Sequence, residues 1–399
     1  MLDFFEFALP VRVVFGWGML DKAGKYIKPH GKRALIVTGK SSAKHGYLTR
    51  LTAQLDELKI AHTVFDGVTP NPKSTEVDAA AKIAVENKCD LIIALGGGSI
   101  MDAAKGVAAV AKNGGGIWDY VYKGPGQKIK TINSALPLIV IPTMAATGSE
   151  LNCGAVISNP ATQEKTPFFA DAVYPKAALI DPQLTVSLPY ANTVDGGIDI
   201  ICHVLEMYLS TDADDYLQDQ LALAVTKTVI RALDILKNDL SNKEARTQLF
   251  WAASLALSGV VNEGRSGEFP MHSIEHVLSA HNDSLAHGRG LAAILLQKIR
   301  SIEKILPAKY RELGELLGST AFTGQRSLSG VEASGGAYIL WQKWLAAHQT
   351  GGGLGEYLRG LDTERLAGQV LRFSGTPDFL PDIKPLYKKD LIEFIEMLR

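Results

Sequence analysis

The chain has 399 residues, 46% of them hydrophobic, which is enough apolar material for two packed domains. Its 41 basic residues nearly balance its 42 acidic ones, and no long run of either sign occurs. This balance argues against nucleic acid or an anionic membrane as the main partner.

The N-terminal segment carries acidic side chains where a signal peptide needs basic ones, and it lacks a continuous apolar stretch. No segment approaches the roughly 20 apolar residues that span a bilayer. The three cysteines form neither a disulfide framework nor a zinc-ribbon pattern. We therefore expect a protein of the cytoplasm. Phe4, Phe5 and Phe7 offer an interface for a homodimer, or they pack against the first strand.

The first half alternates short apolar runs with helical patterns. The runs 32–39, 61–67, 90–98 and 136–143 each read as a buried strand that ends in a turn, and roughly 43–59 and 73–88 show helical periodicity. Strands rich in Val, Ile and Leu and separated by helices are typical of a parallel sheet covered on both sides. Ligands of such sheets gather at the carboxyl ends of the strands.

A glycine-rich turn opens a helix in LIIALGGGSIMDAAKG, residues 91–106. Its glycines permit a tight turn, and the helix start offers N–H groups and a positive dipole end to a phosphate. The pattern is not the dinucleotide fingerprint GxGxxG, and a turn without a ligand is the alternative. A second cluster, IPTMAATGSE at 141–150, places hydroxyl groups at a strand end, where a turn or helix cap is the alternative.

After about Pro189 the residue pattern changes to long alanine- and leucine-rich segments at helical spacing, and no further strand is expected. This predicts an α/β domain over residues 1–188 and a separate all-helical domain over 189–399. Gly- and Ser-rich stretches at 318–336 and 349–355 read as loops between helices.

Asp199 and His203 stand four residues apart in an expected helix, so both side chains lie on one face. Further along, PMHSIEHVLSAHNDSLAHGRG contains His272, His276, His281 and His287. A carboxylate with imidazoles suits a divalent ion such as iron or zinc, which can polarise an alcohol or carbonyl oxygen. A metal and a nucleotide in one chain point to redox chemistry.

The glycine turn, the hydroxyl cluster, and the DxxxH pattern followed by two spaced histidines occur in the order found in the iron-containing alcohol dehydrogenase family. The resemblance covers nearly the whole chain, and ATGSELNCGAVIS is similar to the branch of butanol dehydrogenases and NADPH-dependent aldehyde reductases. The chain departs from the family pattern twice. Met144-Ala145-Ala146 replaces Thr-Ala-Gly, so one hydroxyl contact to the cofactor is lost. The last histidine follows His272 by one residue more than usual.

The resemblance implies a dehydroquinate-synthase-like fold with an N-terminal Rossmann-like domain of mostly parallel sheet, an all-α C-terminal metal domain, and a cleft between them. It assigns the metal to Asp199, His203, His272 and His287. His276 would lie beside the open coordination site, where we expect it to relay a proton, since the usual pKa of histidine is near 6.5. His281 is a loop residue or a substitute ligand. Glu206 either orients a ligand or forms a salt bridge on the helix face. Cofactor contacts are implied for Gly97, Gly98, Ser99, Asp102, Thr143, Thr147 and Lys165.

The cofactor preference follows from the end of the run 32–39. NAD-preferring members that resemble this chain tend to carry an aspartate where Gly39 stands, and that carboxylate would repel a 2′-phosphate. Here Gly39 is followed by Lys40 and Ser41, which offer a cation and a hydroxyl donor. The sequence therefore predicts NADP(H) over NAD(H), with a solvated Lys40 and binding of both cofactors as the alternative.

The predicted function is a metal-dependent, NADP(H)-linked interconversion of primary alcohols and aldehydes, with Fe²⁺ as the metal and Zn²⁺ also possible. Alternatives are a glycerol-dehydrogenase-like or other polyol dehydrogenase that uses NAD, and a catalytically dead nucleotide or metal sensor. A dehydroquinate synthase would need a basic pocket, and the segment 262–272 offers only one arginine.

Overall fold

A computed structural model describes residues 4–265, 267–320, 336–374 and 376–399. The chain forms two compact units. The first, an α/β unit, comprises Ala8–Leu188 and Leu257–Gly259, and the second, a helical unit, comprises Pro189–Ala256, Val260–Arg399 and the N-terminal residues through Phe7. No helix among the described residues combines the length and the apolar character needed to cross a membrane.

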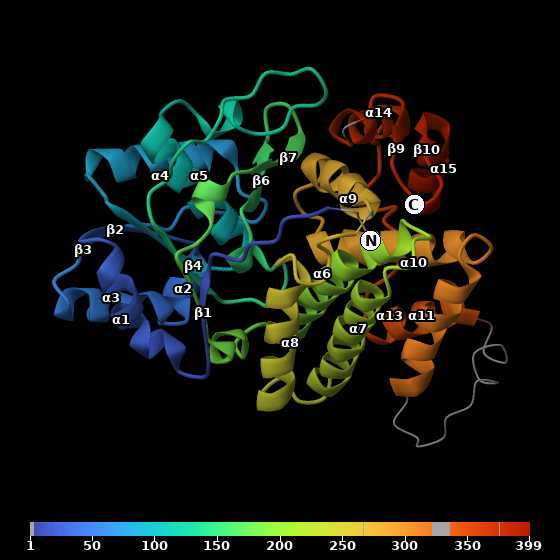
Figure 1. Ribbon diagram of the computed structural model, residues 1–399, viewed down its shortest axis with the longest axis horizontal. Helices are drawn as coiled ribbons and strands as arrows, with labels where there is room; N and C mark the ends of the chain where they lie inside the picture. The colour runs from blue at the N-terminus through green and yellow to red at the C-terminus, as the bar shows by residue number, and fades with distance from the viewer. Residues whose placement is uncertain (1–3, 266, 321–335, 375) are drawn as a thin grey trace. The chain divides into compact units, whose positions relative to one another are not determined.

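The α/β unit contains a six-stranded, fully parallel sheet in the order β1-β8-β5-β4-β2-β3 (Figure 1). Its strands are β1 (Arg12–Phe15), β2 (Arg33–Thr38), β3 (Ala61–Phe65), β4 (Leu91–Gly96), β5 (Leu138–Pro142) and β8 (Ala177–Ile180). The expected strands at 32–39, 61–67, 90–98 and 136–143 are confirmed as β2, β3, β4 and β5. The sequence analysis missed β1 and β8, which are only four residues long.

Helices cover both faces of this sheet: α1 (Ala23–Ile27) and α3 (Tyr47–Glu57) lie on one side, and α4 (Ser74–Glu86) and α5 (Gly98–Asn113) on the other (Figure 1). Alternate residues of one strand therefore enter different cores. Ile93 of β4 packs in the cluster that contains Leu51 and Leu55 of α3, while its neighbour Ile92 is equally buried. Burial on both faces explains the continuous apolar runs.

Two further features of the α/β unit differ from the expected pattern. The helix expected at 43–59 is broken into α2 (Lys40–Lys44) and α3, because Gly46 adopts a left-handed conformation with φ 73°. A separate antiparallel hairpin of β6 (Gly154–Asn159) and β7 (Glu164–Phe169) follows β5. Short 3₁₀ segments occur at Met19–Lys22, Lys28–His30, Ile117–Asp119, Ser149–Leu151, Asp171–Val173 and Pro182–Thr185.

The helical unit is built around α6 (Tyr190–Leu209), which is buried along most of its length and packs against α7, α8, α9 and α10. The other helices are α7 (Tyr216–Leu236), α8 (Lys243–Ala256), α9 (Pro270–His281), α10 (His287–Ile302), α11 (Pro307–Thr320), α13 (Gly336–Ala347), α14 (Thr363–Phe373) and α15 (Lys388–Met397). Strands β9 (Phe379–Leu380) and β10 (Leu386–Tyr387) form a short antiparallel pair, so this unit is not purely helical. The expected loop at 349–355 is confirmed, whereas most of that at 318–336 lies outside the described residues.

Glycines allow the helices around α6 to approach closely. A Cβ at Gly197 would lie 2.7 Å from Leu233 Cδ1 on α7, and one at Gly288 would lie 2.0 Å from the carbonyl oxygen of Asp195. Both distances are far shorter than a carbon atom tolerates. The first turn of α10 is therefore held directly against α6.

Gly288→Ala should destabilise the protein by about 1–3 kcal/mol, because the methyl group forces α10 away from the backbone of α6. Gly368→Ala is the matched control. Gly368 lies inside α14 with open space around its Cα, so alanine should stabilise by about 1 kcal/mol. Thermal unfolding of both variants measures the difference, and equal midpoints would contradict the close packing of α6 and α10.

Candidate metal and nucleotide sites

Helix α6 presents a line of buried polar side chains at helical spacing. Asp199, His203 and Glu206 follow one another at i, i+4 and i+7 and are 2%, 5% and 0% exposed. Polar groups buried this deeply need partners. Two further histidines approach them from neighbouring helices: His272 from the first turn of α9, and His287 as the first residue of α10.

The three histidines surround the carboxylate of Asp199. Its Oδ1 lies 3.4 Å from Nε2 of His272 and 3.4 Å from Nε2 of His287. Nδ1 of His203 lies 3.6 Å from the same oxygen, is buried, and makes no hydrogen bond with any described residue. Ligand atoms that each lie about 2.1 Å from a tetrahedral metal are about 3.4 Å apart. The donor set and its spacing therefore fit a divalent transition metal.

Two glutamates hold the far sides of two of these rings. Nδ1 of His272 contacts Oε2 of Glu206, and Nδ1 of His287 contacts Oε2 of Glu275. Both carboxylates are completely buried. Of the two roles left open for Glu206, the structure shows the contact with a histidine. Sequence reasoning missed Glu275, since a glutamate at a helical position usually faces solvent.

Burial and neighbouring charges act in opposite directions on the pKa values of this cluster. Burial disfavours the charged form of Asp199, yet His203, His272 and His287 hold its pKa well below the usual value. Burial, with the neighbouring His272 and His287, lowers the pKa of His203 to about 3 despite the pull of Asp199. For His272 burial is outweighed by Glu206 and Asp199, which raise its pKa to about 10.

The remaining two histidines of the predicted cluster take different places. The His276 ring is half-buried and stacks on His287 with 5.6 Å between centroids, so it lies beside the cluster. His281 lies one helical turn further along α9, where its Nε2 contacts Oε1 of Gln369 on α14, 2.5 Å away. The structure thus gives His281 a partner other than the Asp199 cluster.

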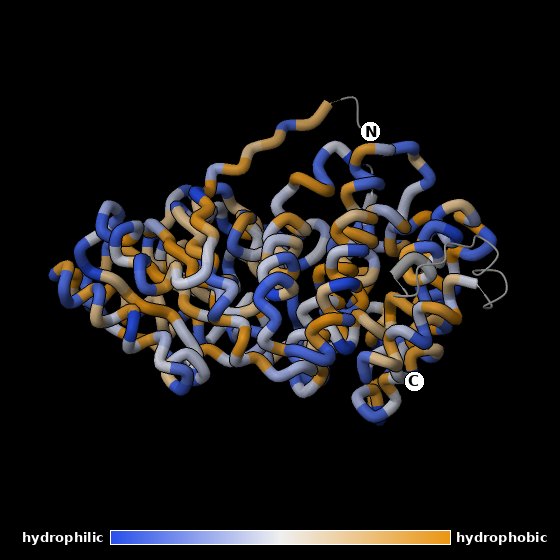
Figure 2. The backbone as a smooth tube through the Cα atoms, turned by 90° about the horizontal axis from the view of Figure 1, so that it is seen from below, coloured by the Kyte–Doolittle hydropathy of each residue, from blue (hydrophilic) through white to orange (hydrophobic). Residues whose placement is uncertain are grey.

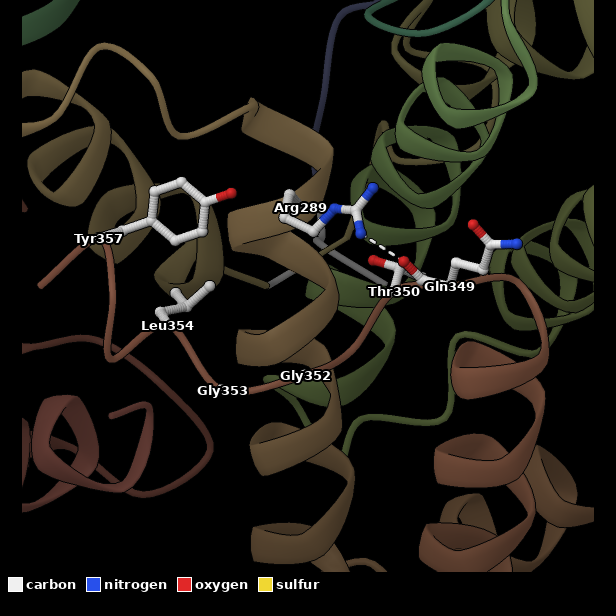
Figure 3. A pocket seen from close by; sticks show the side chains of 7 residues that line it. All are labelled: Arg289, Gln349, Thr350, Gly352, Gly353, Leu354 and Tyr357. Carbon is white, nitrogen blue, oxygen red and sulfur yellow. Dashed lines mark hydrogen bonds between the residues drawn. The ribbon is translucent and has the colours of Figure 1, made fainter.

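A small cavity of about 280 Å³ lies next to the first turn of α10. It is lined by Arg289, Gln349, Thr350, Gly352, Gly353, Leu354 and Tyr357 (Figure 3). Arg289 reaches across it to the carbonyl oxygen of Gln349, and its Nε lies 3.5 Å from Oδ1 of Asp195. The guanidinium group therefore ties α10 to α6 and to the 349–353 loop, immediately after His287.

In the α/β unit, the strand ends bring the two predicted nucleotide clusters together. The N–H of Thr143 donates to the carbonyl oxygen of Gly96 over 3.1 Å. A Cβ on Gly98 would lie 2.4 Å from Cγ2 of Thr147, so only glycine lets these segments meet. Gly97 has its Cα near the side chain of Met144, the residue that departs from the family pattern. Ser99 lies in the first turn of α5.

Asp102 and a lysine that the sequence analysis missed join the same region. Asp102 accepts hydrogen bonds from Oγ of Ser149 and the N–H of Val156, over 2.7 and 2.9 Å. Lys105 is completely buried and donates to Ser149, Asn152 and the carbonyl of Gly154. Burial lowers the pKa of Lys105 to about 8 against the opposing charge of Asp102. These contacts fasten α5 to the 149–156 segment.

The other predicted cofactor residues are Lys165 in β7, Gly39 at the end of β2, and Lys40 and Ser41 in α2. Lys165 of β7 is buried, and its Nζ donates to Oδ1 of Asn71 over 3.0 Å. Gly39 directly follows β2 in an extended conformation, and Ser41 is exposed in α2. The Nζ of Lys40 is paired with Oδ2 of Asp66, just beyond β3, at 2.6 Å. A carboxylate is therefore present near this strand end, although Gly39 itself carries none.

Comparison with known proteins decides the family. The model of iron-containing alcohol dehydrogenases matches residues 10–182, and that of the C-terminal region of the Fe-containing alcohol dehydrogenase family matches residues 193–337. The chain belongs to the iron-containing alcohol dehydrogenase family. It is an oxidoreductase of the alcohol dehydrogenase and aldehyde reductase type, and the resemblance and fold class inferred from the sequence are confirmed.

The chain is similar in sequence and in fold to named alcohol dehydrogenases and aldehyde reductases. NADH-dependent butanol dehydrogenase A of Clostridium acetobutylicum is 40% identical over 73% of this chain and 73% of its own length. NADPH-dependent aldehyde reductase YqhD of Escherichia coli is 33% identical over 73% and 74%. The crystal structure of NADH-dependent butanol dehydrogenase A from Thermotoga maritima superposes with a TM-score of 0.86, at 30% identity over 100% of this chain and 99% of that one.

His203→Ala should lose bound metal and activity together, because it removes one of the imidazoles around Asp199. Metal content by mass spectrometry and aldehyde reduction are the measurements, with circular dichroism as the folding control. A folded His203→Ala protein that keeps its metal and its activity would show that His203 is not a ligand.

Proposed function

We propose that this enzyme interconverts primary alcohols and aldehydes with NADP(H), using a divalent metal held by Asp199, His203, His272 and His287. The observation that supports this ligand set is the convergence of two imidazole Nε2 atoms on Asp199 Oδ1, each at 3.4 Å. Iron is the expected metal, and zinc fits the same donors. The butanol dehydrogenases among the relatives favour a short, unbranched substrate.

When bound, the metal supplies positive charge that polarises the alcohol or carbonyl oxygen. The nicotinamide accepts or donates the hydride. In this proposal His276 relays the proton, because its half-buried ring stacks on the His287 ring and meets the His272 ring edge-on. An imidazole changes charge near neutral pH, so it can supply the proton that aldehyde reduction requires.

On the α/β side, we assign the cofactor to the carboxyl edge of the sheet. Gly97, Gly98 and Ser99 lie where α5 begins, and backbone N–H groups with a positive dipole end suit a pyrophosphate. Thr143 and Thr147 border this turn. Burial raises the pKa of Asp102, while the charge of Lys105 and, least of the opposing causes, that of Lys165 act against this rise.

Metal-stripped enzyme should reduce butyraldehyde only after Fe²⁺ or Zn²⁺ is restored, because the carbonyl needs the positive charge of the metal. NADPH and NADH oxidation at 340 nm is the measurement, with each metal added separately. Full turnover of the stripped enzyme without added metal would contradict the metal-dependent mechanism. Nucleotide binding without turnover under any refill would point to a different substrate class.

The preference for NADP(H) rests on Gly39, which offers no carboxylate to repel a 2′-phosphate. Lys40 supplies a cation, although Asp66 already pairs with it, so a phosphate would compete with that carboxylate. The relatives include both cofactor types, since the named butanol dehydrogenases use NADH and the aldehyde reductase uses NADPH.

Gly39→Asp should shift the preference towards NAD(H), because the new carboxylate repels the 2′-phosphate and can bond a ribose hydroxyl. Gly39→Ala is the matched control: its Cβ meets the same neighbours, the carbonyl of Val68 at 3.2 Å and Ile100 at 3.4 Å, without a charge. The ratio of kcat/KM for NADPH and NADH is measured for all three proteins. A Gly39→Asp ratio equal to that of Gly39→Ala would refute this pocket.

The homodimer and the cytoplasmic location stay predictions. Phe4, Phe5 and Phe7 are 83%, 42% and 46% exposed. They belong to an N-terminal segment that is coloured hydrophobic along most of its length (Figure 2). This exposed apolar surface supports pairing with a second copy of the chain.

A further inference from the structure

Two of the three histidines around Asp199 are backed by a buried glutamate, and the two arrangements form a series. Glu206 on α6 contacts Nδ1 of His272 on α9. Glu275 on α9 contacts Nδ1 of His287 on α10. Thus α6 supplies the carboxylate that contacts the histidine of α9, and α9 supplies the one that contacts the histidine of α10.

We infer that Glu206 and Glu275 are positioning residues that select Nε2 of His272 and His287 as metal-binding atoms and set the affinity of the site. This inference rests on the metal site proposed above. A carboxylate beside Nδ1 accepts a hydrogen bond from its N–H, which keeps the proton on Nδ1 and so makes Nε2 the nitrogen that can offer its lone pair to a metal. Both Nε2 atoms face Asp199 Oδ1, as binding requires.

Glu206 also fixes where α9 begins. Its Oε1 accepts hydrogen bonds from the N–H groups of Met271 and His272, the latter over 3.0 Å. These are N–H groups of the first helical turn, which have no partner within the helix. One buried side chain therefore joins α6 to α9, satisfies the start of α9 and orients the ring of His272.

The chain makes room for Glu275 in a comparable way. A Cβ on Gly290 would lie 3.0 Å from Cγ of Glu275, so the second glycine of the His-Gly-Arg-Gly turn lets the carboxylate pass beside α10. Oγ of Ser279, one turn further along α9, donates to Oε2 of Glu275 over 3.3 Å. Oε2 of Glu275 is thus shared between the Ser279 hydroxyl of its own helix and the His287 ring of α10.

A different role for Glu275 has to be separated from this one. Glu275, His276 and His287 also bring three ligand atoms within 4.8 Å of one another, so Glu275 is geometrically able to bind a metal itself. A positioning residue and a ligand respond differently to Glu275→Gln. The amide oxygen still accepts from Nδ1, but an amide is a poor replacement for a carboxylate ligand.

The experiment uses metal-stripped full-length protein, wild type, Glu206→Gln and Glu275→Gln, titrated with Zn²⁺ against a chromophoric chelator and with Co²⁺ for its d–d bands. Both glutamine variants should bind Zn²⁺ roughly 10- to 100-fold more weakly while keeping the wild-type positions of the Co²⁺ bands. Glu303→Gln is the matched control, since Glu303 is exposed at the end of α10 and its variant should bind as wild type does.

His287→Ala supplies the spectrum of a site that has lost one ligand. Co²⁺ bands of Glu275→Gln that shift as those of His287→Ala do would make Glu275 a ligand and overturn the inference. Zn²⁺ affinities of both glutamine variants equal to that of wild type would overturn it as well. If Glu206→Gln does not fold, the Glu275 variant decides.

The same titration separates this inference from the proposed metal site. A His203→Ala protein that binds Zn²⁺ as tightly as wild type would refute the ligand set. Loss of metal in His203→Ala, together with unchanged affinity in both glutamine variants, would refute only the positioning role.

Discussion

The helical unit depends on one buried charge, the carboxylate of Asp199. A carboxylate that is 2% exposed is costly unless opposite charge or hydrogen-bond donors surround it. Two helices meet this requirement, with His272 from α9 and His287 from α10 each bringing Nε2 to 3.4 Å from Oδ1. The close approach that Gly288 allows between α10 and α6 brings His287, the residue before it, to this carboxylate. The spacing of these groups fits the cation proposed above.

Some of this architecture could be predicted because its cause is local. The runs that became β2, β4 and β5 are apolar on both faces, which only a covered parallel sheet explains. The spacing of Asp199 and His203 places them on one helix face by geometry alone. The glycine turn before α5 is also recognisable in the sequence. The structure gives a reason for one of its glycines, since a Cβ on Gly98 would collide with the side chain of Thr147.

The rest depends on contacts that the sequence does not display. β1 is only four residues long and is held by its pairing with β8, far along the chain. Asp181, just after β8, accepts hydrogen bonds from the N–H groups of Gly18 and Leu20 in the segment that follows β1. In the sequence Glu275 looks like an ordinary polar residue of a helix, and only the folded structure shows that it contacts His287 of α10. The carboxylate that pairs with Lys40 comes from Asp66, just beyond β3, and the contact of His281 with Gln369 on α14 gives that histidine a partner outside the cluster.

The same geometry bears on which metal the site holds. Nitrogen ligands with a single carboxylate suit Fe²⁺ and Zn²⁺ alike, and the general affinity order favours zinc. In the positioning role proposed for them, Glu206 and Glu275 would place negative charge behind two of the imidazoles, which would strengthen the binding of either ion without distinguishing between them. The family points to iron, and the proposed donors suit iron and zinc alike, so the supply of the two metals would decide which ion occupies the site.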